Sequence, residues 1–298
     1  MSIELKNVTY TYSPGTAYES HALKDVSLVI PDGQFIGIIG HTGSGKSTLI
    51  QHLNALVQPT SGQVLYNGED VWAEKYDRKQ LRSEVGLVFQ YPEHQLFEND
   101  VISDVCFGPM NQGLSREEAE KEAKQALTQV GVKESNFKKS PFELSGGQKK
   151  RVAIAGVLAM NPKILILDEP TAGLDPKERI RIRNLISEVA KDKIVIIATH
   201  VVTDVEFIAK EIVMLSNGKI IRSGSPSKLL NELDGKVWNI FLSDNEIDEV
   251  NTGYKVSNIS RDADGVIARI IADSYDGRWQ KEAVRPNLED LYLYLNGD

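Results

Sequence analysis

The chain has 298 residues, 41% of them hydrophobic, which is enough for one large domain with a core and a smaller appended one. Acidic residues outnumber basic ones by 42 to 34, giving a net charge of -8, so the overall positive field of a nucleic-acid-binding protein is missing and we expect no nucleic acid as a partner. The single cysteine, Cys106, and an N-terminus without the features of a signal peptide predict a reducing cytoplasmic location.

Apolar and β-branched runs predict strands at 3–12, 26–30, 34–40, 62–68, 85–90, 163–170, 193–200 and 211–221. Helices are predicted at 46–56, 115–130, 147–160 and 177–190, and Ser115 with Glu118 predicts a capping box at the start of the second. The strand-rich first part indicates an antiparallel layer beside a parallel α/β core. The longest apolar runs have only strand length, so any membrane role is expected to be peripheral.

The pattern of predicted elements changes from about Gly235, where short strand-like runs precede a terminal LEDLYLYL. This pattern predicts a small α+β domain over residues 235–298, after a larger domain over residues 1–225. No internal repeat or low-complexity segment is visible.

The stretch GHTGSGKST at 40–48 follows a strand and leads into a helix, the context that a phosphate-binding loop requires. Its glycines allow backbone amides to turn towards a β-phosphate, Lys46 can span the β- and γ-phosphates, and Ser47 can bind Mg²⁺. The alternative, a glycine-rich turn that happens to contain a lysine, does not explain this context. The predicted nucleotide-binding residues are Gly40, His41, Thr42, Gly43, Ser44, Gly45, Lys46, Ser47 and Thr48.

Three further strand ends carry polar residues that suit the same site. Asp168 and Glu169 follow four aliphatic residues, which places them at the carboxyl edge of the sheet, where ligands of open α/β folds bind. Asp168 is predicted to hold Mg²⁺ and Glu169 to be the general base, although both could be helix-capping acids. His200 is a predicted donor to the γ-phosphate, and Gln90 a metal ligand that positions water; alone, each could be an ordinary polar residue at a strand end.

A second glycine-containing stretch, LSGGQ at 144–148, precedes another helix about a hundred residues after the first. Ser145, Gly146 and Gly147 offer a hydroxyl and bare amides to an anion. One fold cannot easily bring two such helix ends to one γ-phosphate. We therefore expect this stretch to serve a nucleotide held by another subunit, so that two chains packed head to tail close each other's sites.

The motifs GHTGSGKST, LVFQ, LSGGQ, LILDEP, AGLD and ATH stand in the order found in nucleotide-binding subunits of ATP-binding-cassette (ABC) proteins, which residues 1 to about 225 resemble. The resemblance implies a P-loop NTPase core with an antiparallel β-subdomain and a helical subdomain. It also implies that Tyr12 stacks on adenine, with Tyr10 as the other candidate. By the same resemblance Ser145, Gly147 and Gln148 contact the opposite ATP, Asp175 bridges the subunits, and Gln90, Glu169 and His200 serve hydrolysis.

The segment YPEHQLF and the following FGP resemble the energy-coupling-factor (ECF) subfamily, whose ATPases drive uptake of vitamins and of cobalt or nickel. Tyr91, Pro92, Leu96 and Phe97 indicate a pocket for a partner's helix, or else a loop anchored by its own aromatic residues. The resemblance implies a pair of ATPases, homo- or heterodimeric, with a transmembrane coupling protein and a substrate-binding membrane protein, at the cytoplasmic face of the cell membrane.

The second half resembles instead the ATPases of exporters with a separate ABC-2-type permease, with a seam between about 160 and 180. A diverged tail and a hybrid chain are both compatible with this pattern. The sequence argues against three rival classes: a soluble ABC protein of translation or DNA repair, a small-molecule kinase, and a domain that binds ATP without hydrolysing it. The single cassette argues against the first class, and LSGGQ argues against the second. The presence of Glu169 and His200 argues against the third.

Overall fold

The computed structural model describes residues 2–31, 33–206, 208–262, 265–275 and 277–296. Contacts between Cα atoms divide the chain into unit 1, Met1–Ile220, and unit 2, Ile221–Asp298. The division falls within strand β10 (Lys219–Gly224). The domain limits expected from the sequence, 1–225 and 235–298, stay a prediction.

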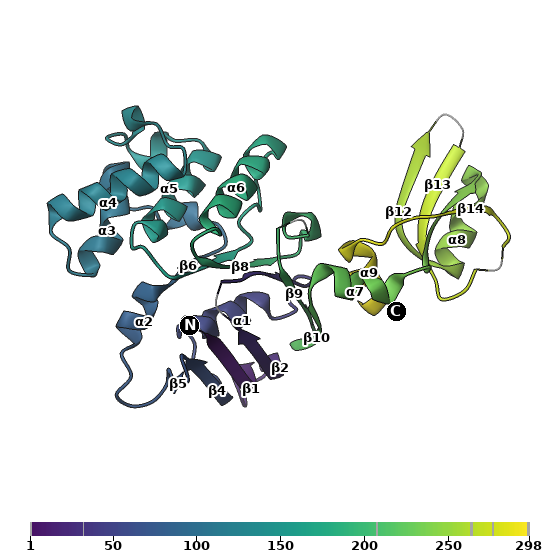
Figure 1. Cartoon of the computed structure of the whole chain (residues 1–298), viewed down its shortest axis with the longest axis horizontal. Coiled ribbons are helices and arrows are strands. Elements are labelled where there is room, and N and C mark those ends of the chain that lie inside the picture. Colours follow the sequence, from purple (N-terminus) through teal and green to yellow (C-terminus); the bar gives the residue numbers. More distant parts are fainter. Residues whose placement is uncertain (1, 32, 207, 263–264, 276, 297–298) are drawn as a thin grey trace. The chain divides into compact units, whose positions relative to one another are not determined.

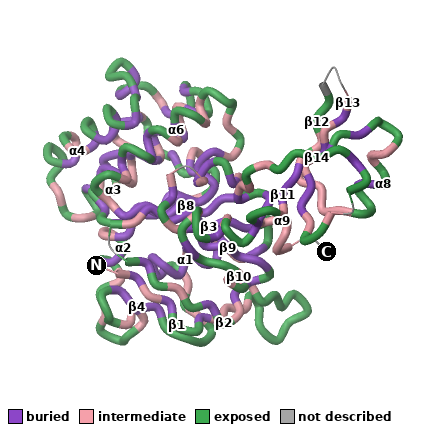
Figure 2. Tube along the Cα trace, turned by 45° about the vertical axis from the view of Figure 1, so that its right-hand side comes forward, coloured by how far each residue is buried: buried purple, intermediate pink, exposed green. Residues whose placement is uncertain are grey.

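The centre of unit 1 is a sheet in the order β10-β9-β3-β8-β7-β6, in which β9, β3, β8, β7 and β6 pair in parallel. These five parallel strands are almost entirely buried, as Figure 2 shows for β3 and β8, because helices and a second sheet cover a parallel sheet on both faces. The bounds are β3 (Phe35–Ile39), β6 (Val85–Val88), β7 (Ile164–Asp168), β8 (Ile194–Thr199) and β9 (Glu211–Ser216). The single strand expected at 211–221 is two strands, since Asn217 and Gly218 turn between them with φ of 49° and 78°.

A second sheet of unit 1 is antiparallel and has the order β2-β1-β4-β5. Its strands are β1 (Ile3–Tyr12), β2 (Ser20–Ile30), β4 (Ser61–Tyr66) and β5 (Glu69–Asp70). Buried residues of this sheet share one hydrophobic core with the parallel sheet, including Ile3, Val26, Ile38 and Ile196. The predicted α/β class with an antiparallel layer is confirmed.

Six α-helices of unit 1 surround the sheets within the described residues: α1 (Lys46–Leu53), α2 (Arg78–Glu84), α3 (Val101–Asn111), α4 (Arg116–Gln129), α5 (Gly146–Leu158) and α6 (Pro176–Val189). Helices α3, α4 and α5 pack together as a helical group (Figure 1). The capping box at Ser115 is present. The sequence prediction missed α2, which has only seven residues, and α3, whose pattern is interrupted by Gly108 and Pro109.

Unit 2 contains an antiparallel sheet in the order β12-β13-β11-β14, with its own core around Trp238, Ile240 and Ile270. Its elements are α7 (Pro226–Leu230), β11 (Val237–Leu242), α8 (Ile247–Gly253), β12 (Lys255–Asp262), β13 (Gly265–Ile271), β14 (Gln280–Ala283) and α9 (Leu288–Asn296). Helix α9 is fixed to the sheet by the buried Asp290, which lies 2.6 Å from the guanidinium of Arg269. Unit 2 is therefore an α+β unit.

Short 3₁₀ helices complete the chain: η1 (Pro92–Gln95), η2 (Glu134–Asn136), η3 (Pro141–Glu143), η4 (Val202–Asp204), η5 (Asn231–Leu233) and η6 (Asp244–Glu246). Among the described residues, no helix combines the length and apolar character that crossing a bilayer would require.

Candidate functional site

The loop between β3 and α1 wraps around the side chain of Lys46. The buried ammonium donates to the carbonyl oxygens of Gly40 at 2.8 Å and His41 at 3.2 Å. Glycine is needed at position 40, because an added Cβ would lie 2.4 Å from Ser44 Oγ and 2.6 Å from the carbonyl oxygen of Leu215. Gly45 has φ of 105°, a left-handed conformation that lets the helix start directly at Lys46. The predicted strand, loop and helix are thus in place.

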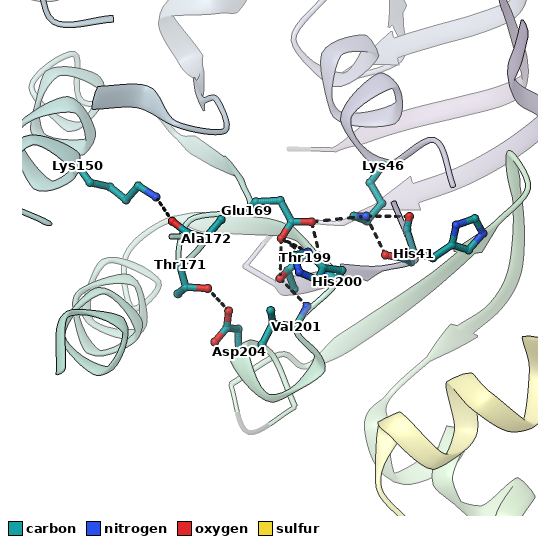
Figure 3. A network of polar contacts seen from close by, with 11 residues as sticks. His41, Lys46, Lys150, Glu169, Thr171, Ala172, Thr199, His200, Val201 and Asp204 are labelled. Atoms are coloured by element: carbon teal, nitrogen blue, oxygen red, sulfur yellow. Dashed lines mark hydrogen bonds and ion pairs between the residues drawn. The ribbon is translucent and has the colours of Figure 1, made fainter. Parts of the chain in front are cut away.

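Glu169 follows β7 and lies at the centre of a polar network (Figure 3). Its carboxylate is 3.5 Å from the Lys46 ammonium and accepts hydrogen bonds from Thr199 Oγ1 at 3.1 Å and from the backbone amide of His200 at 3.1 Å. The Nδ1 atom of His200 is 2.9 Å from the same carboxylate. Glu169 has φ of 47°, a left-handed value rare outside glycine and common at functional sites. The carboxylate is therefore held in one place by groups from β8 and α1.

The neighbouring Asp168 is buried, and its Oδ1 atom has no hydrogen-bond partner among the described residues. Burial raises the pKa of Asp168 above its ordinary value, while a hydrogen bond from Ser47 and the charge of Lys46 act in the opposite direction. No group of three or more His, Cys, Asp or Glu side chains forms a metal cage in the described part of the chain. A free carboxylate oxygen beside a serine hydroxyl does suit Mg²⁺, which takes few protein ligands and fills its shell with water and phosphate oxygens.

A pocket of about 310 Å³ opens over the loop 42–48. It brings together most of the predicted nucleotide-binding and catalytic residues: Tyr12, Thr42, Gly43, Gly45, Lys46, Ser47, Thr48, Gln90, Glu169 and His200. Gly40, His41 and Ser44 belong to the same loop without being part of the lining, and Asp168 lies behind Ser47. Ser20, His21 and Ala22, which start β2, also line the pocket. No sequence motif marks these three residues.

The structure distinguishes the two tyrosines that the sequence left open. Tyr12 lines the pocket, is 41% exposed, and its hydroxyl is 3.1 Å from Thr48 Oγ1. Tyr10 is partly buried against the core, with its ring edge-on to Tyr12 at 4.8 Å and to His52 at 5.1 Å. The arrangement favours Tyr12 as the ring available to an adenine base.

The stretch 145–148 lies at the start of α5 and is not part of this pocket's lining. Ser145 Oγ accepts from the backbone amide of Gln148, whose side chain accepts from the amide of Ser145, so the two form a capping box. Gly147 packs against Glu178 of α6, where an added Cβ would lie 2.8 Å away. Asp175 is exposed and caps α6 by accepting from the amide of Glu178 at 2.9 Å. These residues therefore form a second surface within unit 1.

Two polar residues of the network were missed by the sequence analysis. Thr199 donates to Glu169 and accepts from the backbone amide of Val201, so it fixes both the carboxylate and the segment after β8. Its place directly before His200 in the ATH motif was the available signal. Asp204, in η4, accepts a hydrogen bond from Thr171 Oγ1, and nothing in the local sequence marks this pair.

The arrangement has the chemistry of a phosphate-transfer site. A lysine ammonium and the amides at the start of α1 can bind phosphate oxygens, and a nearby carboxylate can orient water and take its proton. A protein-family model described as "ABC transporter" matches residues 23–172, about half of the chain. The chain therefore belongs to the family of ATP-binding-cassette transporter ATPases.

Similar proteins narrow the class. Two energy-coupling factor transporter ATP-binding proteins EcfA2, from Caldanaerobacter subterraneus subsp. tengcongensis and from Enterococcus faecalis, are each 52% identical over 237 residues, covering 78% of this chain and 82% of theirs. The structure of cbiO1 from Clostridium perfringens, described as part of the ABC transporter complex cbiONQ, superposes with a TM-score of 0.69 at 37% identity over 84% of this chain and 94% of cbiO1.

A dimeric ATP-binding cassette in a post-hydrolysis state, bound to ADP and Pi, has a TM-score of 0.65 at 32% identity, over 75% of this chain and 98% of that one. The predicted ECF-type ATP-binding subunit, which binds ATP and couples its hydrolysis to transport, is confirmed. A match over 78% of the chain must extend beyond residue 180, so the similarity to ECF ATPases continues past the predicted seam. The resemblance of the tail to exporter ATPases stays a prediction.

Proposed function

We propose that this chain hydrolyses ATP in a head-to-tail pair with a second ATPase subunit, identical or similar, and drives uptake of a vitamin or a transition-metal ion. The pair acts at the cytoplasmic face of the cell membrane with a transmembrane coupling protein and a substrate-binding membrane protein. The observation that carries the proposal is the separation of two surfaces: the pocket holds Lys46 and Glu169, whereas Ser145 and its neighbours lie outside the lining of that pocket.

Within the pocket, Lys46 and the amides of residues 43–48 bind the phosphates, and Tyr12 stacks on the base. Glu169 takes a proton from the attacking water, with His200 and Gln90 positioned on the lining to orient the γ-phosphate and that water. Ser47, Gln90 and Asp168 would hold Mg²⁺, which when bound neutralises charge on the phosphate oxygens. The 2.9 Å contact between His200 and Glu169 lets the histidine keep the carboxylate aligned.

The second surface is proposed to complete the site of the other subunit. Ser145, Gly146, Gly147 and Gln148 form an exposed or half-exposed helix start, except for the buried Gly147, and a helix N-terminus attracts phosphate oxygens. Asp175 lies exposed at the start of α6, where it can bridge the two subunits. The dimeric relative bound to ADP and Pi supports a paired arrangement.

A groove of about 420 Å³ between η1, α3 and α5 supports a membrane partner. It is lined by Pro92, Leu96, Phe97, Phe107, Val152 and Met160, among others. Phe97 and Phe107 are 58% and 48% exposed and meet edge to face at 5.0 Å. Exposed aromatic rings over an apolar groove suit the apolar side of a short helix, and we assign that helix to the coupling protein.

The test is affinity purification from membranes of the Glu169→Gln variant with ATP, followed by mass identification of the copurifying proteins. Blocking hydrolysis should trap the closed assembly, so a second ATPase, a coupling protein and small substrate-binding membrane proteins are expected. The matched control is Glu169→Gln combined with Lys46→Ala, which should bind ATP poorly and recover less of the second ATPase. Recovery of one large permease would instead support the exporter alternative.

A second test addresses the shared sites. Mixing a Lys46→Ala variant with a Ser145→Arg variant should restore roughly a quarter of the wild-type turnover if the chain pairs with itself, because half the pairs are mixed and each has one intact composite site. If the native partner is a similar ATPase, the two variants are combined across the two chains. Independent sites would give no restoration.

A further inference from the structure

The side chain of Lys150, on α5, is fully buried, which is unusual for a lysine and costly unless the charge has partners. Its ammonium donates to the carbonyl oxygen of Ala172 at 2.7 Å and lies 5.8 Å from the centre of the Tyr91 ring. Burial lowers the pKa of Lys150, and the charge of Glu93 acts in the opposite direction. This lysine therefore contacts two segments outside its own helix.

The first of these segments is 91–96, which lines the proposed coupling groove through Pro92 and Leu96. Tyr91 has φ of 54° and stacks on His94 at 6.0 Å between ring centres, so its ring is fixed over the lysine. Glu93 follows two residues later and has one buried carboxylate oxygen without a hydrogen-bond partner among the described residues. The charge of Lys150 thus faces both a ring and a carboxylate of this segment.

The second segment is the turn 170–173, between Glu169 and Asp175. The backbone amide of Ala172 donates to the carbonyl oxygen of Glu169 at 3.1 Å, so two hydrogen bonds lead from Lys150 to the backbone of Glu169. On its other side the turn is anchored by Thr171, whose hydroxyl donates to Asp204 (Figure 3). A displacement of Lys150 would therefore act on this turn and, through Ala172, on the backbone of Glu169.

We propose that Lys150 is a positioning residue that couples segment 91–96 to Glu169 through the turn 170–173, so that a partner seated in the groove changes the placement of the Glu169 carboxylate. This inference rests on the proposed function, since it assumes that the groove receives a membrane partner. Lys150 itself lies outside the lining of the nucleotide pocket, so its effect on hydrolysis has to pass through other residues.

The experiment compares ATP turnover of the isolated chain with turnover of the complex reconstituted with its membrane partners, and takes the ratio as the stimulation factor. Lys150→Met keeps the length of the side chain and removes both the charge and the donor. We expect the stimulation factor to fall at least about fivefold, with KM for ATP within about twofold of the wild-type value. Partial unfolding would lower both rates together and leave the ratio unchanged.

Lys149→Met is the matched control, because Lys149 is the next residue on α5 and its ammonium lies over the exposed Phe142 ring, 5.6 Å from the ring centre. Its stimulation factor should equal that of the wild type. Tyr91→Leu removes the ring and leaves the hydrogen bond to Ala172, so a smaller loss is expected. The double variant Lys150→Met with Tyr91→Leu should be no worse than Lys150→Met alone, because both changes interrupt one path.

The outcomes distinguish a failure of the role proposed for Lys150 from a failure of the proposed function. A stimulated wild type with an equally stimulated Lys150→Met variant overturns the inference and leaves the proposed function standing. Additive losses in the double variant also overturn it, since independent effects are not one path. A wild type that its membrane partners do not stimulate contradicts the proposed function, and this inference with it.

Discussion

The nucleotide pocket of unit 1 depends on charged and polar side chains, whereas the groove of the same unit depends on apolar ones. Around the pocket, the Glu169 carboxylate is held by Lys46, Thr199 and His200 through hydrogen bonds and ion pairs of 2.9 to 3.5 Å. The groove presents exposed rings, Phe97 and Phe107, that are held by packing. Chemistry needs fixed charges, whereas a docking surface needs apolar area that can be covered, so changes in the two regions should have effects of different kinds.

The largest effect is expected at Glu169. Glu169→Gln should lower ATP turnover at least about a hundredfold while ATP still binds, because an amide keeps the hydrogen-bonding shape and cannot take a proton from water. Turnover and equilibrium binding of ATP are measured on the same preparation. Glu188→Gln, at an exposed position of α6, is the control. Turnover at the wild-type rate would show that Glu169 is not the base.

Ser145 and Ser115 offer a matched pair, since each closes a capping box at the start of its helix. Replacing either with alanine should cost about 1 kcal/mol of unfolding free energy. Only Ser145→Ala should also lower ATP turnover, about tenfold, because its hydroxyl is proposed to reach the nucleotide of the other subunit. The measurements are denaturant unfolding and steady-state ATPase rates. Equal losses of turnover in both variants would trace the effect to helix stability.

In the groove, Phe97→Ala should lower partner-stimulated turnover severalfold, since it removes the most exposed ring of the lining. Stimulated ATPase and transport in reconstituted vesicles are the measurements. Ile180→Ala, which removes a similarly exposed apolar side chain from α6, should leave both unchanged. Intact stimulation and transport in Phe97→Ala would remove the groove from the coupling path.

The smallest effect is expected in the pH dependence of stability, and it comes from the buried carboxylate of Asp204. Burial raises the pKa of Asp204, Glu169 acts in the same direction, and the hydrogen bond from Thr171 and the charges of Arg179 and Arg183 oppose it. The folded state therefore holds this proton more tightly than the unfolded state, and wild-type stability falls as pH rises through the window above the ordinary aspartate value of 3.8.

Asparagine at position 204 does not titrate. The free energy of unfolding of Asp204→Asn, minus that of the wild type, should thus be larger at pH 7 than at pH 4. Urea unfolding at the two pH values measures the difference, with the exposed Asp192→Asn as the matched control. A pH-independent difference would contradict the raised pKa.

Local sequence patterns were sufficient for the parallel core and for most of the pocket. Strands with continuous aliphatic residues, the glycines of 40–45 and the carboxylates after β7 all follow from short-range rules: burial on both faces, left-handed φ at glycine, and ligands at the carboxyl edge of a sheet. The capping box at Ser115 is equally local. These features need only neighbouring residues, and the sequence alone therefore determined them.

Tertiary structure decided what depends on distant segments meeting. That the core partly covers the ring of Tyr10 was visible only in the structure, and the contacts of Thr199 and Asp204 depend on β8 and η4 lying beside the turn after β7. The burial of Lys150 against Ala172 and Tyr91 joins residues 22 and 59 positions away from it, and no periodicity encodes such a contact. A pattern along the chain reports the neighbours of a residue in sequence, whereas hydrogen bonds and burial depend on its neighbours in space.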